Sequence, residues 1–420
     1  MPTATSTLPD EVVVHVPEHS ARQAGIARGL NIVPGMDDDG WEVAEPVQLS
    51  DGSVVRLLKD GEALRAWHDA VKAARQSIFI ETYIFADDQT GKAFCDVLVS
   101  KAREGVHVYL LYDSFGSKAT PYEFFHQMER AGVHVREFHP IAPWRCNFSW
   151  RPFNRDHRKL TIIDGQVAGL GGLNIANEYG GSWIIGHTPE LDNLWRDCGI
   201  GIEGPAVEAL ASSFIRTWSY VSRGGRFNRA LLNHNLDGSE GPVGVLSAVP
   251  SLASQMSHML GNLLQHAKRS ICLTSAYFAP SDDLVEVLCR AARRKVKVRL
   301  MLPTKTDSLT MVTAARSFYA QLLSAGVEVH ERQHAKLHAK TVVIDEEISV
   351  LGSTNFDYRS IDYNCELAVV IRSRLFAAQM LRLFEHDVSF SRCIDPKVWR
   401  RRPHRDRLIQ WMVNRSRYLL

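Results

Sequence analysis

The chain has 420 residues, of which 45% are hydrophobic and 23% are charged, a composition typical of folded globular proteins. A chain of this length predicts two domains of about 150 to 200 residues, each with its own core. Lys and Arg total 49 against 47 Asp and Glu, which gives a formal net charge of +2. This balance excludes the chain-wide basic field that gathers nucleic acid, so any basic surface must be local.

Three features of the sequence bear on where the chain works. The N-terminus has no basic stretch followed by an apolar run, so no signal peptide is predicted. No window approaches the roughly 18 consecutive apolar residues of a spanning helix, so any membrane contact is predicted to be peripheral. Seven scattered cysteines without a CxxC pair predict reduced thiols of a cytosolic protein: Cys95, Cys146, Cys198, Cys272, Cys289, Cys365 and Cys393.

The chain contains an internal repeat. "AARQSIFIETYIF" at 73–85 resembles "HAKRSICLTSAYF" at 266–278, and in both a helix end passes through Ser into an apolar strand that finishes in an aromatic residue. Further helix-to-strand units follow at equivalent places in each half, including an "AGV" that closes a helix and opens a strand. This alternation predicts an α/β fold in which helices cover a largely parallel sheet in each half.

The repeat also divides the chain. The stretch 223–244 is rich in Gly and Asn and lacks long apolar periodicity, which is typical of a linker. We therefore predict a lead-in, a first domain, this linker, a second domain and a basic tail, with the bounds 1–50, 51–222, 223–244, 245–395 and 396–420.

One short motif occurs once in each half. "HRKLTIID" at 157–164 and "HAKTVVID" at 338–345 carry the same three polar residues at identical spacing, namely His157, Lys159 and Asp164, and His338, Lys340 and Asp345. Each is followed by a Gly-containing turn that ends in an Asn, Asn174 or Asn355. Residues i and i+2 of a strand point to the same side, so each His is predicted to share a face with its Lys.

The residue types of the motif indicate a phosphate chemistry. If the halves pack about a pseudo-twofold axis, one site receives two imidazoles, two ammonium groups and two Asn amides. The ammonium and amide donors would neutralise a phosphodiester. One imidazole would attack phosphorus while the other protonates the leaving alcohol, so the two histidines must begin in opposite protonation states.

The remaining acidic residues near the motifs have separate predicted roles. Each His needs a hydrogen-bond acceptor, and the sequence offers Asp197 in the first half and Glu366 in the second, both at the start of an apolar strand. Asp164 and Asp345 lie seven residues beyond their histidines, too far along a strand to reach them. We predict that these two aspartates hold the strand ends through local hydrogen bonds.

The duplicated motif with its trailing Asn resembles the phospholipase D superfamily over roughly residues 55–390. "NRDHRKLTIIDGQVAGLGGLNIANEY", "WRDCGIGIEGPAV" and "GSTNFDYRSIDYNCELAVV" are similar to the cardiolipin synthases, in particular the shorter bacterial type without N-terminal transmembrane helices. The resemblance implies two tandem α/β/α sandwich domains related by a pseudo-twofold axis, with the active site at their interface. It also implies exchange through a phosphohistidine, with no metal or other cofactor.

The resemblance also assigns roles to residues. His157 would be the nucleophile and His338 the general acid and then base, while Lys159, Lys340, Asn174 and Asn355 hold phosphate oxygens with help from Ser353. Gly172 stands where the family usually has Ser, so the first half lacks one hydroxyl donor. The implied donor is phosphatidylglycerol, the acceptor is a second phospholipid, and the implied location is peripheral, at the cytoplasmic face of the cell membrane. No nucleic acid partner is expected.

Several alternatives remain open at this stage. The same site would serve a hydrolytic phospholipase D, in which water takes the second step. A nuclease or other phosphodiesterase is disfavoured by the near-neutral charge, and a catalytically idle membrane-binding protein by the intact duplicate motifs. A metal pair of His334 and His338 needs a helix, whereas the segment is predicted to be a strand.

Two basic segments have more than one interpretation. The stretch 140–156 mixes Trp and Phe with Arg, which suits a lipid entrance, single-stranded nucleic acid or simple loop packing. Residues 397–420 hold eight Lys or Arg against one acid, Asp406. Leu408, Met412 and Leu419 fall toward one side of a helix there, which favours an interfacial helix on an anionic membrane surface. The alternative is a terminal helix docked on the body of the protein.

Overall fold

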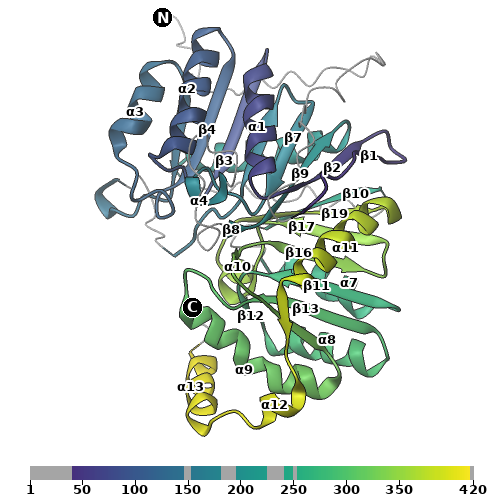
Figure 1. Ribbon diagram of the computed structural model, residues 1–420. Coiled ribbons are helices and arrows are strands. Elements are labelled where there is room, and N and C mark those ends of the chain that lie inside the picture. The colour runs from purple at the N-terminus through teal and green to yellow at the C-terminus, as the bar shows by residue number, and fades with distance from the viewer. Residues whose placement is uncertain (1–39, 146–152, 181–194, 225–240, 249–252, 417–420) are drawn as a thin grey trace, which may run out of the picture.

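The computed structural model describes residues 40–145, 153–180, 195–224, 241–248 and 253–416. It has two halves, each built on one eight-stranded sheet (Figure 1). The sheet of the first half has the order β1 (Val47–Gln48), β2 (Val54–Lys59), β9 (Cys198–Glu203), β7 (Val167–Gly171), β6 (Leu160–Ile163), β3 (Ser77–Thr82), β4 (His107–Asp113) and β5 (His134–Phe138). That of the second half has the order β10 (Val243–Ala248), β19 (Glu366–Arg372), β17 (Ile348–Gly352), β16 (Lys340–Ile344), β11 (Ser270–Ser275), β13 (Lys297–Pro303), β14 (Glu328–Arg332) and β20 (Ser391–Cys393).

The two strand orders correspond position by position. The run from β2 to β5 in the first sheet matches the run from β10 to β14 in the second, and only the edge strands β1 and β20 have no counterpart. The tandem repeat predicted from the sequence is therefore present in the fold.

The sheets are mixed, so the prediction of a largely parallel sheet was wrong. Only β3, β4 and β5, and likewise β11, β13 and β14, run parallel to one another, while the other neighbouring strands pair antiparallel. The parallel strands are joined by crossover helices, as the alternation indicated. The motif strands instead turn back through tight hairpins, β6 into β7 and β16 into β17, which a pattern of helix-to-strand units does not predict.

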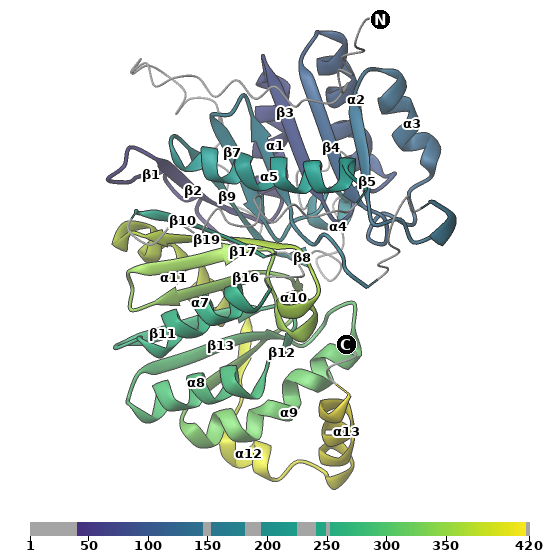
Figure 2. The same cartoon turned by 180° about the vertical axis from the view of Figure 1, so that it is seen from behind.

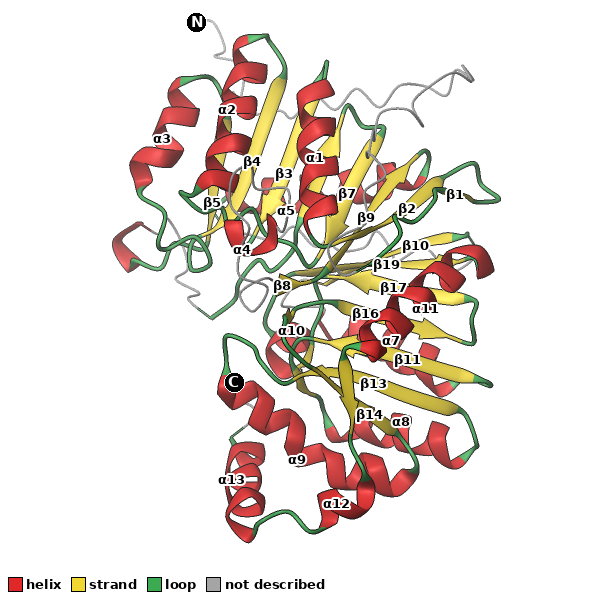
Figure 3. Ribbon diagram, in the orientation of Figure 1, coloured by secondary structure: helices red, strands yellow, loops and turns green. Residues whose placement is uncertain are grey.

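Helices cover both sheets (Figures 1 and 3). Those of the first half are α1 (Gly61–Ala73), α2 (Gln89–Arg103), α3 (Tyr122–Arg130), α4 (Asn177–Gly180) and α5 (Ala206–Ser222). Those of the second half are α7 (Ala253–Gln265), α8 (Asp282–Arg293), α9 (Leu309–Ala325), α10 (Tyr358–Asp362) and α11 (Arg374–Ser389), followed by α12 (Pro396–Arg400) and α13 (His404–Arg415). Helix α5 lies on the face of the first sheet opposite to α1 and α2, as the reverse view shows (Figure 2). Each half is thus an α/β/α sandwich, as the resemblance implied.

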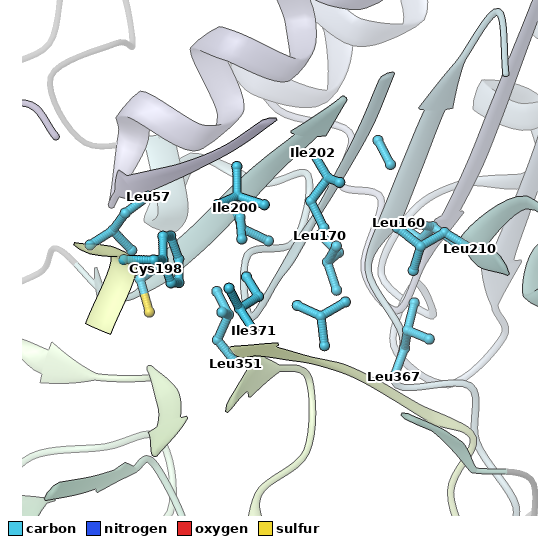
Figure 4. Packing of buried hydrophobic residues seen from close by; sticks show 14 of the residues in the cluster. Leu57, Leu160, Leu170, Cys198, Ile200, Ile202, Leu210, Leu351, Leu367 and Ile371 are labelled. Atoms are coloured by element: carbon cyan, nitrogen blue, oxygen red, sulfur yellow. The ribbon is translucent and has the colours of Figure 1, made fainter. Parts of the chain in front are cut away.

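The apolar interior is shared between the halves, which corrects the expectation of two separate cores. One cluster fills the first half beneath α1, α2 and α3, and another fills the second half beneath α7, α8 and α9. A third cluster joins the two sheets face to face: Leu170 and Ile200 come from the first half, and Leu351 and Leu367 from the second (Figure 4). This shared core fixes one half against the other.

The chain outside the sheets was predicted less completely. The end of the lead-in is built into the fold, because Trp41 and Val47 are buried in the shared core. Most of the predicted linker, residues 225–240, lies outside the described residues. The same holds for residues 1–39 of the predicted lead-in. None of the described helices is long and apolar enough to cross a membrane.

Candidate active site at the junction of the two halves

Each motif histidine is held by the backbone of the opposite half. The backbone N–H of His157 donates to the carbonyl of Cys365 at 3.0 Å, and that of His338 donates to the carbonyl of Arg196 at 2.7 Å. Next to His338, β15 (Lys336–Leu337) pairs with β8 (Trp195–Arg196) of the first half. The histidines therefore lie at the seam between the halves, just before the strands β6 and β16 rather than within them.

The two predicted acceptors cross over between the halves. Glu366 of the second half lies 3.1 Å from Nδ1 of His157, and Asp197 of the first half lies 2.7 Å from Nδ1 of His338. An ionised carboxylate can only accept a hydrogen bond, so wherever Glu366 and Asp197 are ionised we assign the proton of the neighbouring ring to Nδ1, which leaves its Nε2 unprotonated. Glu366 directly follows Cys365, and Asp197 directly follows Arg196, whose carbonyls bind the histidine backbones. Two consecutive residues of the opposite half therefore hold the backbone and the side chain of each histidine.

The two motif lysines are buried beside the histidines. Nζ of Lys159 donates to the carbonyl of His157 at 2.5 Å, and Nζ of Lys340 lies 2.7 Å from Nδ1 of His338. Burial lowers the pKa of Lys159 to about 7 and that of Lys340 to about 8. An anion entering the site would favour the charged form of both lysines.

Both histidines have lowered pKa values, which favour the neutral form. Burial and then Lys159 lower the pKa of His157, against the opposite effect of Glu366. Burial, Lys340 and Lys159 lower the pKa of His338 well below its usual range, and His157 adds to the effect. Groups from the two halves therefore act on one another across a single site. The predicted difference in protonation between the two histidines would have to arise when an anionic substrate binds.

The turns that follow the motif strands differ between the halves. In the second half, the hydroxyl of Ser353 donates to Glu366 and accepts from the backbone N–H of Leu367 at 3.0 Å. Its counterpart is Gly172, where a Cβ atom would lie only 2.4 Å from both carboxylate oxygens of Asp197. The carboxylate of Asp197 thus occupies the space that a serine side chain would need, which explains why this turn has glycine.

The two asparagines of these turns have unequal surroundings. The side-chain oxygen of Asn174 accepts from the backbone N–H of Ile84 at 3.1 Å, and its Nδ2 donates to the hydroxyl of Tyr179 at 2.8 Å. Asn355 is buried, and its side-chain oxygen has no hydrogen-bond partner among the described residues. Asn174 thus holds the first-half turn together, while the buried side-chain oxygen of Asn355 is satisfied by none of the described residues.

Aromatic side chains around the histidines were not singled out from the sequence. Tyr83 contacts His157 edge to face with ring centroids 5.1 Å apart, and Nζ of Lys159 lies 5.2 Å from the centre of the same ring. Tyr179 and Trp195 contact His338 in the same manner, at 5.4 and 4.8 Å. The repeat gave no signal for Tyr83, because the aromatic residue that ends the repeated segment is Phe85 and the residue equivalent to Tyr83 in the second half is Ala276.

The motif aspartates lie at the far ends of the hairpins. The carboxylate of Asp164 accepts from the backbone N–H groups of Arg75, Gln76 and Ser77 at 2.7 to 3.2 Å. Asp345 does the same for Lys268, Arg269 and Ser270 at 2.6 to 3.0 Å. Both aspartates therefore bond the segment that leads into the neighbouring strand, a structural arrangement remote from the histidines.

Two further sequence interpretations can be placed. His334 is exposed, and the described residues contain no cluster of three His, Cys, Asp or Glu side chains arranged for a metal. Of the aromatic and basic segment 140–156, residues 146–152 lie outside the described residues. Trp144 and Phe153 are exposed, whereas Arg155 is buried 3.5 Å from Asp113 and does not present its charge to solvent.

Comparison with known families agrees with this geometry. The family model described as "Cardiolipin synthase, PLD-like domain" matches residues 68–180 and 260–388, one match in each half. This chain belongs to that family. The phospholipase D-like resemblance inferred from the duplicated motif is therefore confirmed.

Individual members of this cardiolipin synthase family align over most of the chain. A cardiolipin synthase from Alkalihalophilus pseudofirmus is 32% identical over 367 residues, which cover 86% of this chain and 71% of that protein. The major cardiolipin synthase of Bacillus subtilis is 34% identical over 339 residues, 79% of this chain and 68% of that protein. The crystal structure of a phosphatidylserine synthase from Haemophilus influenzae superimposes with a TM-score of 0.67 over 90% of this chain and 97% of that one, at 12% identity, which shows the shared fold.

Proposed function

We propose that this protein is a cardiolipin synthase, which transfers a phosphatidyl group from phosphatidylglycerol to the hydroxyl of a second phospholipid and releases glycerol. The observation that carries the proposal is the crossed pair of histidines, each bonded through Nδ1 to a carboxylate of the other half and flanked by a buried lysine. Such a site offers one nucleophile, one proton carrier and two cations for a single phosphodiester.

The first step forms the covalent intermediate. Nε2 of His157 attacks the phosphorus of phosphatidylglycerol, the bond from phosphorus to the glycerol oxygen breaks, and His338 gives its Nε2 proton to that oxygen. His338 carries this proton once the phosphodiester is bound, because a nearby negative charge favours the imidazolium. The ammonium groups of Lys159 and Lys340 balance the charge that develops on the phosphoryl oxygens, and the side-chain Nδ2 of Asn355 donates a hydrogen bond to one of them.

The second step reverses the roles. His338, now neutral, takes the proton from the hydroxyl of the second phospholipid, whose oxygen attacks phosphorus while the bond to Nε2 of His157 breaks. Water in place of that hydroxyl would yield phosphatidic acid instead. The burial of both lysines, both carboxylates and His338 limits the access of water to the intermediate. We propose that the protein works as a peripheral protein at the cytoplasmic face of the membrane.

The decisive measurement is a product analysis. Purified protein is incubated with phosphatidylglycerol vesicles, alone and with phosphatidylethanolamine, and the products are identified by mass spectrometry. We expect cardiolipin and glycerol in equal amounts from phosphatidylglycerol alone. Phosphatidic acid without cardiolipin would contradict the proposal and assign the site to a hydrolytic phospholipase D. Cleavage of an oligonucleotide but not of lipid would assign it to a nuclease.

The roles of the two histidines need a separate measurement. Phosphatidylglycerol with a labelled phosphate should leave an acid-labile label on the protein, which His157→Ala abolishes. His338→Ala should acquire the label more slowly, because the first step then lacks its acid, and should keep it once formed, because the second step lacks its base. Label that survives His157→Ala and disappears in His338→Ala would reverse the assignment.

A further inference from the structure

Among the described residues, helix α13 packs on the rest of the protein through one face. Asn414 donates to the hydroxyl of Ser317 on α9 at 2.7 Å, and Gln410 accepts from Arg402 at 2.9 Å. Val413 packs against the small cluster formed by Ala279, Met311 and Ala314. These contacts place α13 beside α9, as Figures 1 and 2 show. The sequence left two interpretations of the tail, a helix docked on the body of the protein and a helix on a membrane. The face of α13 that carries Val413 and Asn414 fits the first of these.

The opposite face of α13 is apolar, basic and exposed. Leu408, Trp411 and Met412 are 57%, 56% and 49% exposed, and Arg415 lies with its guanidinium 5.1 Å from the centre of the Trp411 ring. These four residues follow a spacing of three and four, so they form one stripe along the helix, with Arg405 on its edge. We call these five residues the outer face of α13.

The sequence of α12 and α13 carries an excess of positive charge. Between residues 396 and 416 the sequence has seven Lys or Arg and one acidic residue, Asp406. The chain as a whole has a net charge of only +2, so this is a local concentration of positive charge. Exposed Trp and Leu side chains surrounded by Arg have the composition of helices that lie in the headgroup region of anionic bilayers.

The position of the helix relates this face to the catalytic loops. Val413 contacts the same cluster as Tyr277 and Ala279, and Ala279 in β12 (Phe278–Ala279) pairs with Asp357 in β18 (Phe356–Asp357). Strand β18 begins directly after Asn355. The docked face of α13 is therefore linked, through this cluster and the pair of β12 and β18, to the loop that carries a candidate phosphate ligand.

We infer that the outer face of α13 is a membrane-docking surface that seats the protein on an anionic lipid bilayer beside its active site. The biological purpose of this surface rests on the proposed function, whereas its binding to membranes can be tested without it. Seating the helix there would let the phosphodiester of a bilayer lipid reach the histidines without the whole lipid leaving the bilayer. The partner is the surface of the bilayer, distinct from the two lipid molecules that react.

The test measures binding without turnover. Full-length protein is sedimented with vesicles of phosphatidylglycerol and phosphatidylcholine, and with vesicles of phosphatidylcholine alone. The triple variant Leu408→Ser/Trp411→Ser/Met412→Ser should lower the partition coefficient by about tenfold or more, because three apolar side chains no longer enter the bilayer. The variant Arg405→Glu/Arg415→Glu should bind more weakly and with a weaker dependence on salt.

A matched control uses an exposed leucine elsewhere. Leu375 on α11 is 70% exposed and lies outside the outer face, so Leu375→Ser should bind as the wild type does. Equal sedimentation of the triple variant and the wild type would overturn the inference, as would an equal loss for Leu375→Ser or equally strong binding to phosphatidylcholine alone. Circular dichroism would establish that the variants remain folded.

Failure of this inference can be told apart from failure of the proposed function. If the triple variant makes cardiolipin from detergent-solubilised phosphatidylglycerol and still sediments fully with vesicles, the docking surface is wrong and the function stands. If the wild type makes no cardiolipin but its sedimentation depends on the outer face, the docking surface stands and the function is wrong.

Discussion

Ser353 and Gly172 occupy equivalent positions in the two halves. Because only one of them has a hydroxyl, the carboxylates beside the two histidines differ in pKa. Burial alone would raise the pKa of Glu366, but His157, Lys159 and the Ser353 hydroxyl outweigh burial and lower it. Burial raises the pKa of Asp197 to about 7, with Lys340 opposing the rise, and no hydroxyl fits beside it. His157 therefore faces the carboxylate that stays ionised, which best stabilises the positive charge of a phosphorylated imidazole. This asymmetry favours His157 as the nucleophile.

The two lysines give the reaction a characteristic pH dependence. The value of kcat/KM reports the free protein, in which Lys159 and Lys340 have pKa values of about 7 and about 8. Both lysines must be cationic to bind a phosphodiester, so kcat/KM should fall as the pH rises through 7 to 8. In the proposed mechanism His157 attacks in its neutral form, so kcat/KM should also fall as the pH drops below its lowered pKa. We expect a bell-shaped profile with its maximum between these limits.

Arginine substitution tests the origin of the alkaline limb. In Lys159→Arg the guanidinium stays charged throughout the accessible range, so the fall near pH 7 should disappear even though the overall rate drops. Profiles of kcat/KM between pH 5 and 9 would show this. An alkaline limb that is unchanged in both Lys159→Arg and Lys340→Arg would mean that neither ammonium group controls binding.

At the scale of the element, the motif aspartates belong to the hairpins. Asp164 and Gly165, and likewise Asp345 and Glu346, have positive φ values, as the central pair of a type I′ turn requires. The backbone N–H after each turn closes it, Gln166 onto Ile163 at 3.0 Å and Glu347 onto Ile344 at 3.1 Å. An aspartate tolerates this conformation, and its carboxylate then reaches the adjacent strand segment.

Removing one such carboxylate should affect stability and not chemistry. Asp345→Ala leaves three backbone N–H groups without their acceptor, and we expect a loss of about 1–3 kcal/mol in the free energy of unfolding. His338 lies at the other end of the strand, roughly 20 Å away, so kcat of the folded protein should be unchanged. Urea unfolding and a rate measurement at 25 °C would check both points.

A neighbouring substitution serves as the control. Glu346 stands at positive φ where the first half has Gly165, so Glu346→Gly should leave the stability unchanged or raise it by up to about 1 kcal/mol. A large fall in kcat for Asp345→Ala, without a fall in stability, would give that aspartate a direct part in the reaction.

What the sequence could predict follows from the range of the interactions. The repeat, the paired motifs and the crossover helices are visible in local spacing, because each depends on residues close together in the chain. The crossing of Glu366 to His157 and of Asp197 to His338 depends on how the halves meet, and no local pattern contains that information. The antiparallel hairpin of β6 and β7 did have a local signal, the Asp164–Gly165 pair. Such a pair between two apolar runs indicates a hairpin more strongly than the alternation of helices and strands indicates a parallel sheet.

At the scale of the molecule, the two halves cannot be regarded as independent domains. They share an apolar cluster that joins the two sheets (Figure 4). Each half also supplies the hydrogen-bond acceptor for the histidine of the other half. An ion pair extends this junction: Arg196 of the first half donates through two nitrogens to Asp387 of the second, at 2.9 Å each, with both side chains buried. Separation of the halves would expose the core and open the site together.

The protein should therefore unfold in one cooperative transition despite its length. Scanning calorimetry is expected to give one peak whose calorimetric and van't Hoff enthalpies agree. Asp387→Ala removes the nearer of the two carboxylates beside the buried Arg196, which keeps only its 3.4 Å contact with Asp60, and it also removes an acceptor 3.4 Å from Arg332. A broken buried pair costs about 3–5 kcal/mol, so the whole peak should move to lower temperature. Breaking the exposed pair of Arg290 and Glu286 with Arg290→Ala should cost less than about 1 kcal/mol. Two separate peaks, of which Asp387→Ala moves only one, would show that the shared core does not couple the halves.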